Sequence, residues 1–185
     1  KLTEWSDWAG DIEIVKDPAK RDQRLEKLYE MGGYFKKLWD ERVDKEPTPD
    51  LISMMIHSEA MKDMSMGEFM GNLVLLIVGG NDTTRNTMSG LAYSLNKFPD
   101  QRAMLEADPS LIPNAVSEII RWQTPLAHMR RTALSDTELE GHTIKAGQKV
   151  IMWYISANRD ESIFPNADKL DIKRENARRH LSFGY

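Results

Sequence analysis

The residues best placed to do chemistry follow two adjacent glycines, in the sequence Gly79-Gly80-Asn81-Asp82-Thr83-Thr84. Two glycines inside a helix each cost about 1 kcal/mol relative to alanine, so another interaction must offset them. Without side chains at these positions, a flat ligand can approach the backbone closely. The Thr83 hydroxyl, one helical turn later, can bond back to the carbonyl of Gly79 or Gly80 and open the turn. Asp82 beside this alcohol is then placed to pass protons inward.

The same residues also fit two interpretations that need no ligand. A strand, a Gly-Gly turn and a helix would account for Gly79-Gly80, and so would a kinked core helix. A P-loop is excluded, because the Gly-Lys-Ser/Thr ending that cradles phosphates is missing. From residue types alone, a structural role and a ligand groove both remain open.

A second candidate is the pair Glu118 and Arg121, which lie three residues apart and therefore share one face of a helix. Most such pairs are exposed and worth about 0.3–0.5 kcal/mol. The neighbouring side chains, however, are apolar: Val116, Ile119, Ile120 and Trp122. This setting favours burial, and because a buried ion pair needs further partners, Arg174 is a candidate third member.

A third candidate is the basic run His128-Met129-Arg130-Arg131, which follows Thr124-Pro125. The imidazole and the two guanidinium groups that follow the helix can bind an anion, since arginine forms bidentate hydrogen bonds with carboxylates and phosphates. An ordinary charged strand edge would give the same sequence. The remaining histidines show no metal-ligand spacing and are expected to be surface or internally hydrogen-bonded residues: His57, His142 and His180.

The elements that position these residues are mostly helices. Apolar residues at helical spacing, together with start and stop signals, predict helices over residues 1–10, 18–43, 50–59, 66–98, 99–107 and 113–123. The longest begins at Ser65, with Glu68 three residues later completing a capping box. The helix over 113–123 carries Glu118 and Arg121, and Thr124-Pro125 ends it.

The remaining segments predict little regular structure apart from a small β part. Residues 10–17 are expected to form a turn and a short extended stretch. Two glycine turns between alternating runs predict a hairpin over Asp136–Val150. The run Val150–Ile155 predicts a buried strand by its composition, and Asn158–Arg179 an ordered loop. The fold class is therefore mainly α with a small β part.

Composition limits what the chain can be. Of the 185 residues 41% are hydrophobic, enough for a real core, while 25 basic against 29 acidic residues argue against a nucleic-acid binder. Cysteine is absent, which excludes disulfides, cysteine-ligated zinc and thiol catalysis for this chain. The longest apolar run, Leu73–Val78, is too short to cross a bilayer. The chain opens at Lys1 without a secretory leader, so we expect an internal piece of a longer, cytoplasmic protein.

In this order, the motifs resemble those of the cytochrome P450 family of haem-thiolate monooxygenases. Residues 79–84 resemble the family's Gly-Gly-x-Asp/Glu-Thr-Thr stretch, and residues 118–121 its Glu-x-x-Arg. Further matches follow along the chain: Arg131-Thr132-Ala133 with Asp136 and Gly141, Ala157-Asn158-Arg159-Asp160, Phe164-Pro165, Leu170-Asp171-Ile172-Lys173-Arg174, and Ser182-Phe183-Gly184. The resemblance covers nearly the whole chain.

The resemblance implies that residues 1–185 are a partial, single cytochrome P450 domain, truncated at both ends. Ser182-Phe183-Gly184 is similar to the first residues of the haem-binding loop, whose cysteine thiolate holds the iron. That cysteine would lie beyond Tyr185, so no metal ligand is expected in this chain. The chain alone is therefore expected to be inactive.

The resemblance also assigns roles to individual residues. Haem would lie against Gly79 and Gly80, and Asp82 and Thr83 would govern proton delivery to the reacting oxygen. Arg131, together with Arg130 or His128, would bind a haem propionate; Arg131 is preferred, with a slip of one residue left open. Two further sets are implied: a structural ion network of Glu118, Arg121 and Arg174 that holds the cysteine loop, and an apolar substrate pocket of Ile77, Val78, Leu126 and Ala127.

Residues 76–86 and 121–133 are most similar to the bacterial soluble alkane hydroxylases, which act on terminal carbons of medium-chain alkanes. The implied activity is insertion of one oxygen atom of O2 into an unactivated C–H bond of a small apolar substrate. Electrons would come from NAD(P)H through a ferredoxin reductase and a ferredoxin. Two alternatives stay open: the same fold acting on fatty acids, sterols or terpenes, and a helical scaffold fragment without haem.

Overall fold

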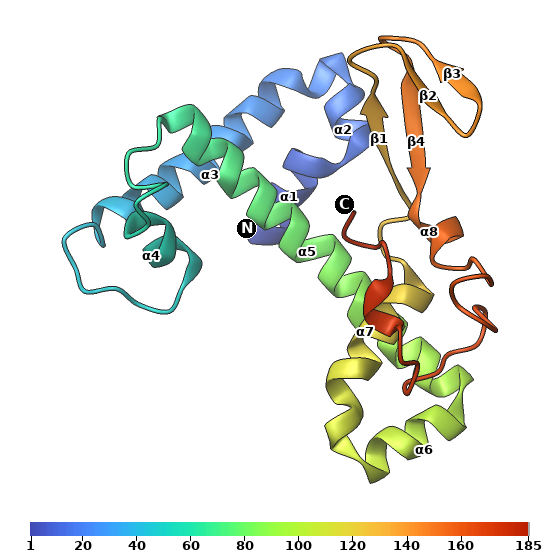
Figure 1. The fold of residues 1–185 in the computed structure, drawn as a ribbon. Helices are drawn as coiled ribbons and strands as arrows, with labels where there is room; N and C mark the ends of the chain where they lie inside the picture. The colour runs from blue at the N-terminus through green and yellow to red at the C-terminus, as the bar shows by residue number, and fades with distance from the viewer. Residues whose placement is uncertain (185) are drawn as a thin grey trace. The chain divides into compact units, whose positions relative to one another are not determined.

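The computed structural model describes residues 1–184 (Figure 1). The chain divides into two compact units, Lys1–Asp82 and a second unit from Thr83 onward. Each unit has its own hydrophobic core. The helix α5 (Met66–Lys97) begins in the first unit and continues into the second. Within the described residues, no helix combines the length and the apolar character that crossing a bilayer requires.

The first unit is helical throughout. Its other elements are α1 (Leu2–Gly10), α2 (Ile12–Lys16), the 3₁₀ turn η1 (Pro18–Lys20), α3 (Arg21–Asp40) and α4 (Leu51–Ile56). Three apolar side chains from three different helices are almost fully buried: Trp5, Met31 and Leu73. The predicted helices over 1–10, 18–43 and 50–59 are thus present, with ends that differ by a few residues.

Local capping signals fix where these helices begin. The Asp17 carboxylate accepts a hydrogen bond from the backbone N–H of Ala19 at 2.9 Å, and the Asp50 carboxylate one from Ser53 at 3.1 Å. At the start of α5, the Glu68 carboxylate accepts from the Ser65 N–H at 2.8 Å, while the Ser65 hydroxyl accepts from the Glu68 N–H at 3.3 Å. This reciprocal pair is the predicted capping box, because two otherwise unpaired backbone donors are satisfied.

One prediction in the first unit is wrong. Residues 10–17 were expected to be a turn and an extended stretch, but Ile12–Lys16 form the short helix α2. The Asp11 carboxylate accepts a hydrogen bond from the Glu13 N–H at 2.8 Å and so caps this helix. A single helical turn is too short for a periodic apolar pattern, and therefore only the cap marks it.

The second unit combines helices with two small antiparallel pairs. Its elements are α6 (Pro99–Ala107), η2 (Pro109–Leu111), α7 (Ile112–Gln123), β1 (His128–Thr132), β2 (Thr137–Leu139), β3 (His142–Ile144), β4 (Lys149–Trp153), α8 (Tyr154–Ala157) and η3 (Ala177–Arg179). Strand β1 pairs with β4, and β2 with β3. The predicted hairpin is confirmed: Glu140 and Gly141, between β2 and β3, both have positive φ, as a two-residue type I′ turn requires.

The prediction of a buried strand over Val150–Ile155 is only half right. Strand β4 ends at Trp153, and residues 154 and 155 begin α8. Ile151 and Trp153 are 48% and 54% exposed. The residue types of a strand indicate which side chains favour burial. Whether those side chains are buried depends on another element packing over the strand. In the described part of the chain, the two-stranded ribbon of β1 and β4 leaves these side chains half open.

The sequence predicted an ordered loop over Asn158–Arg179, and in the structure contacts with α6 and α7 hold this segment. Ile172 is fully buried in one core with Ile119 and Trp122. The Trp122 indole N–H donates to the Asp168 carbonyl at 2.8 Å, and the Ile172 N–H donates to the Gln101 side chain at 3.0 Å. Figure 1 shows this segment, in orange and red, running past α7 mostly as loop, with the short 3₁₀ turn η3 within it.

We expect Gly10→Ala to lower the urea midpoint of unfolding, although alanine favours helices. A Cβ atom at Gly10 would lie 2.9 Å from Val78 Cγ1, and the branched valine side chain cannot move aside freely. Overpacking of this kind costs about 1–3 kcal/mol. The matched control is Gly33→Ala in α3, where an added Cβ meets nothing within 4 Å. The control should hold or raise the midpoint, and an equal rise in both variants would contradict the close packing at Gly10.

Candidate functional site

The centre of the second unit is a buried ion network on α7. Glu118 and Arg121 are fully buried, and Arg174 is 7% exposed. Arg121 Nε and Nη2 donate to the two carboxylate oxygens of Glu118 at 2.7 and 2.8 Å, which is a bidentate pair. Arg174 Nε lies 3.1 and 3.2 Å from the same two oxygens. The structure thus brings together the three residues that the sequence proposed as one network.

The remaining N–H groups of both guanidinium groups bind backbone carbonyls of the loop after α8. Arg121 donates to the carbonyl of Asn158 at 2.7 Å and to that of Ala167 at 2.9 Å. Arg174 donates to the Pro165 carbonyl at 2.9 Å. Because this loop has no ladder of its own, the two arginines supply donors that regular structure would otherwise supply.

The glycine motif lies inside α5, which is helical without interruption from Met66 to Lys97. This excludes the alternative of a strand and a Gly-Gly turn. Gly79 and Gly80 are exposed, and a Cβ atom added at either would meet nothing within 4 Å. Asp82 and Thr83 are half-buried, and the Thr83 carbonyl accepts a hydrogen bond from the Thr87 hydroxyl at 2.7 Å. Backbone access for a flat ligand is open here, and the roles of Asp82 and Thr83 stay predictions.

The basic run forms strand β1, with His128, Arg130 and Arg131 all exposed. Side chains alternate along a strand, so His128 and Arg130 share one face and Arg131 lies on the other. The His128 ring packs against Trp153 on β4 with ring centroids 4.7 Å apart. A single anion can therefore bind either Arg131 on one face of β1, or His128 together with Arg130 on the other face. The strand does not bring all three side chains to the same face.

The first unit contains a pocket of about 450 Å³ that includes two of the predicted residues, Ile77 and Gly80. Its other walls are mostly apolar: Leu2, Thr3, Phe35, Leu51, Ile52, Leu73, Leu76 and Asn81. Asn81 Nδ2 is buried and has no hydrogen-bond partner within the described structure. Val78, also predicted to line a pocket, lies close to Gly10, where an added Cβ atom would be 2.9 Å from its Cγ1, and its place in a substrate pocket stays a prediction.

The other two predicted pocket residues, Leu126 and Ala127, belong to the second unit. Both are half-buried in the segment between α7 and β1. The Ala127 carbonyl accepts a hydrogen bond from the Ile155 N–H at 3.2 Å. A shared pocket of all four residues stays a prediction.

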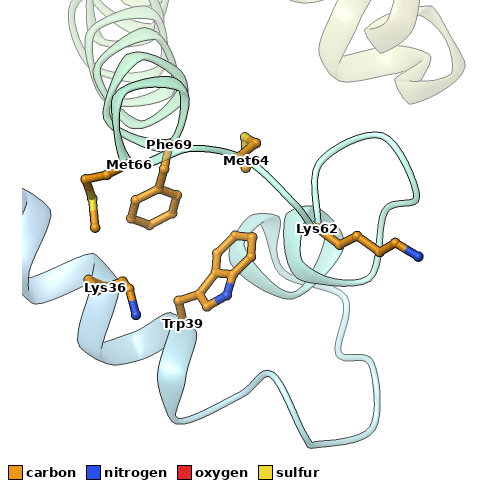
Figure 2. A pocket seen from close by; sticks show the side chains of 6 residues that line it. All are labelled: Lys36, Trp39, Lys62, Met64, Met66 and Phe69. Atoms are coloured by element: carbon orange, nitrogen blue, oxygen red, sulfur yellow. The ribbon is translucent and has the colours of Figure 1, made fainter.

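Figure 2 shows a smaller pocket of about 180 Å³ in the first unit, which the sequence did not suggest. Trp39 and Phe69 face each other across it, edge to face, with ring centroids 5.2 Å apart. Its two cations are already paired: Lys36 with Asp40, and Lys62 with Glu59 at 2.8 Å. The pocket is best explained as a gap in packing between aromatic and methionine side chains.

The histidines outside β1 behave differently from one another. His57 is exposed and lies within hydrogen-bond distance of the carbonyls of Ser53 and Lys45, and His142 is exposed on β3. His180 is buried, and its Nδ1 accepts a hydrogen bond from the Ser182 N–H at 3.3 Å. Burial lowers the pKa of His180, so the neutral ring is favoured. These positions agree with the expectation of surface or internally bonded histidines.

Sequence reasoning missed the part played by Asn158. It is fully buried, and its side chain meets Thr124, Leu181 and Ser182. An Asn followed by charged residues at the end of a short helix looks like a turn residue, and its partners lie 23 to 34 residues away. No local pattern could have found them.

The sequence model of a family described as Cytochrome P450 matches residues 19–184. The chain belongs to the cytochrome P450 family. CYP153D17 from Sphingomonas sp. PAMC 26605 has a solved structure with 70% sequence identity and a TM-score of 0.87, covering 100% of this chain and 46% of that one. Cytochrome P450-153 from Novosphingobium aromaticivorans shows 66% identity and a TM-score of 0.86, covering 100% of this chain and 45% of that one.

Among curated relatives, linalool 8-monooxygenase of Pseudomonas putida is 39% identical over 175 residues, which is 94% of this chain and 42% of its own length. The chain thus spans less than half the length of the cytochrome P450 relatives that it matches. The likeness to the solved structures extends over the full chain and confirms the predicted fold class, mainly α with a small β part of the cytochrome P450 fold.

The family implies a haem cofactor, and the chain's residues fit the edges of such a group. Gly79 and Gly80 leave the backbone of α5 open to a flat ring, and exposed Arg130 and Arg131 carry the donors that carboxylates bind. The iron ligand is a different matter: the chain contains no cysteine, and the described residues hold no cluster of three His, Asp or Glu that could bind a metal. The assignment of these residues to the ring and its carboxylates stays a prediction.

In the whole protein, we expect Glu118→Ala to prevent accumulation of soluble, haem-loaded enzyme. The change leaves two buried guanidinium groups without their carboxylate, and stranding buried charge costs about 3–5 kcal/mol. Soluble yield and haem per protein would be measured. The matched control is Glu106→Ala, which removes an exposed carboxylate 2.8 Å from Arg102 on α6. Normal haem loading in both variants would contradict a structural role for the network.

Proposed function

We propose that the whole protein is a haem-dependent monooxygenase that inserts one oxygen atom of O2 into an unactivated C–H bond, with terminal carbons of medium-chain alkanes as its target. The observation that carries the proposal is the family match over residues 19–184, which includes the Gly79–Thr84 motif on an unbroken helix. The monooxygenase name of the linalool relative supports the reaction class. Similarity of residues 76–86 and 121–133 to alkane hydroxylases supports the substrate.

Haem with a thiolate ligand activates O2 and favours cleavage of its O–O bond. The chain's own contribution to binding is geometric. Gly79 and Gly80 let the ring approach the backbone of α5, where any side chain would hold it away. Arg131 would bind a propionate carboxylate, with the set of Arg130 and His128 as the alternative on the opposite face of β1. The two glycines and the basic residues would thus hold different parts of the group.

Proton delivery falls to Asp82 and Thr83. The Thr83 hydroxyl is one helical turn from Gly79 and can hold a hydrogen bond to the reacting oxygen. Asp82, half-buried beside it, can take protons from solvent and pass them on. An alcohol and a carboxylate on adjacent residues of α5 would thus form a short relay.

The alkane assignment depends on an apolar pocket. Ile77, Val78, Leu126 and Ala127 offer no hydrogen-bonding side chain for a head group, so an unfunctionalised chain is favoured over a carboxylate or a ring alcohol. Electrons come from NAD(P)H through a ferredoxin reductase and a ferredoxin, in the cytoplasm. Residues 1–184 are part of one catalytic domain in this proposal.

One observation favours a second candidate, the same reaction on an oxygenated substrate such as a fatty acid, sterol or terpene. Asn81 Nδ2 is buried, lines the 450 Å³ pocket and has no partner within the described structure. A donor in this position suits a ligand with an acceptor oxygen, because an unmade buried hydrogen bond costs about 1–3 kcal/mol. The scaffold alternative is disfavoured by the family match.

In the whole protein, we expect Thr83→Ala to bind haem and substrate and to consume reduced cofactor, but to release hydrogen peroxide in place of most of the alcohol. Asp82→Asn should slow turnover, because the relay loses its ionisable group and keeps its shape. Alcohol formed per cofactor oxidised is the measurement. Thr84→Ala, at the exposed neighbouring threonine, is the matched control and should stay coupled. Full coupling in Thr83→Ala would contradict the relay.

We expect kcat/KM for oxidation of octane to its 1-alcohol to exceed kcat/KM for hydroxylation of octanoic acid. The reason is that the four apolar pocket residues provide no anchor for a carboxylate. The two substrates would be compared side by side with the same redox partners. A preference for the acid that disappears in Asn81→Leu would instead establish the oxygenated substrate class. That outcome would leave the monooxygenase assignment intact.

A further inference from the structure

The last turn of α7 is closed by two side-chain hydroxyl groups. Thr124, in the left-handed region at φ 46°, donates its hydroxyl to the Arg121 carbonyl at 2.7 Å. The Ser182 hydroxyl, from the far end of the chain, donates to the Ile120 carbonyl at 3.1 Å. Each hydroxyl has a single proton. Both groups are therefore committed as donors to α7 and can only accept from any other neighbour.

Asn158 supplies what these two hydroxyl groups need. Its Nδ2 donates to Thr124 Oγ1 at 3.0 Å and to Ser182 Oγ at 2.9 Å, so both amide protons are used. Its Oδ1 accepts the backbone N–H of Leu181 at 2.7 Å. Among short side chains, an amide combines two N–H donors with a carbonyl acceptor, as this position requires. A carboxylate has no proton to give, and leucine offers neither group.

Hydrogen bonds to both backbone polar groups of Asn158 fix the direction of its side-chain amide. The Asn158 carbonyl accepts from Arg121 Nη1 at 2.7 Å, and its N–H donates to the Tyr154 carbonyl at 2.8 Å. Asn158 is fully buried, so water does not compete for these groups. The side chain is thereby attached to the same guanidinium that pairs with Glu118.

The segment that Asn158 holds is itself a tight turn. The Gly184 N–H donates to the Leu181 carbonyl at 2.9 Å, and Gly184 has φ +73°. A Cβ atom on Gly184 would lie 2.9 Å from the Tyr154 hydroxyl oxygen. Leu181–Gly184 therefore packs as one piece against α8 and the end of α7.

We infer that Asn158 is a positioning residue: its amide fixes the turn Leu181–Gly184 against the last turn of α7, and so sets the direction of the haem-binding loop that begins there. This inference rests on the proposed function, because the resemblance of Ser182-Phe183-Gly184 identifies the turn as the start of that loop. In the whole protein, a cysteine farther along this loop would supply the thiolate ligand of the haem. Asn158 would act on that ligand only by holding the start of the loop in place.

The test uses the whole protein with Asn158→Leu, which keeps the number and branching of the side-chain heavy atoms and removes all three hydrogen bonds. The reduced protein under carbon monoxide reports the ligand, since the thiolate-ligated form has a strongly red-shifted Soret band. The ratio of the red-shifted to the unshifted band should fall about tenfold, because buried groups are left unpaired. The matched control is Asn176→Leu in the same loop, whose amide donates to the Ile163 carbonyl at 2.7 Å, and it should keep the wild-type ratio.

Two further measurements decide the inference if Asn158→Leu fails to fold. Ser182→Ala removes one of the three bonds and should lower the same ratio by about threefold. In hydrogen exchange, the Leu181 amide should exchange at least tenfold faster in Asn158→Ala, which removes the oxygen that accepts the Leu181 N–H, while the Glu118–Arg121 helix keeps its protection. A wild-type ratio in Ser182→Ala together with unchanged Leu181 exchange in Asn158→Ala would overturn the inference. If wild type shows no red-shifted band, the proposed function fails, and Leu181 exchange still decides the role of Asn158.

Discussion

One buried carboxylate, Glu118, lies between two buried guanidinium groups, and the irregular half of the second unit depends on this contact. Removing three charges from water is costly, by several kcal/mol per ion. The arrangement offsets that cost only because every partner is well placed: Arg121 is bidentate, and Arg174 approaches both carboxylate oxygens. The Asp171 N–H also donates to Glu118 at 3.0 Å. The network therefore tolerates little change in any of its members.

The same network explains how a long segment without helix or strand stays ordered. Helices satisfy their own backbone groups, but the carbonyls of Asn158, Pro165 and Ala167 have no ladder partner, and Asn158 and Ala167 are buried. The two arginines donate to them. Charge and hydrogen bonding thus act together: the guanidinium charges are balanced by Glu118, and their remaining N–H groups order the chain. Asn158 extends this order to the turn at Leu181–Gly184.

Helix α5 carries glycines that no close packing requires. Glycine weakens a helix relative to alanine, yet a Cβ atom added at Gly79 or Gly80 would meet nothing within 4 Å. Gly10 differs, because Val78 lies close to the position of its missing Cβ atom. Gly10 therefore serves packing within the first unit, whereas the proposed function gives the pair on α5 a different role, close approach of a flat group to the backbone.

The sequence by itself determined the local features. The caps at Asp17, Asp50 and Ser65, the hairpin turn at Glu140-Gly141 and the pairing of Glu118 with Arg121 each involve residues within a few positions of one another. Ordered motifs along the chain were also sufficient for the family. The tertiary structure alone decided the burial of His180, the half-open faces of β4 and the contacts of Asn158 with Thr124 and Ser182. These depend on segments far apart in the chain, because burial and long-range hydrogen bonds are fixed only when separate elements pack together.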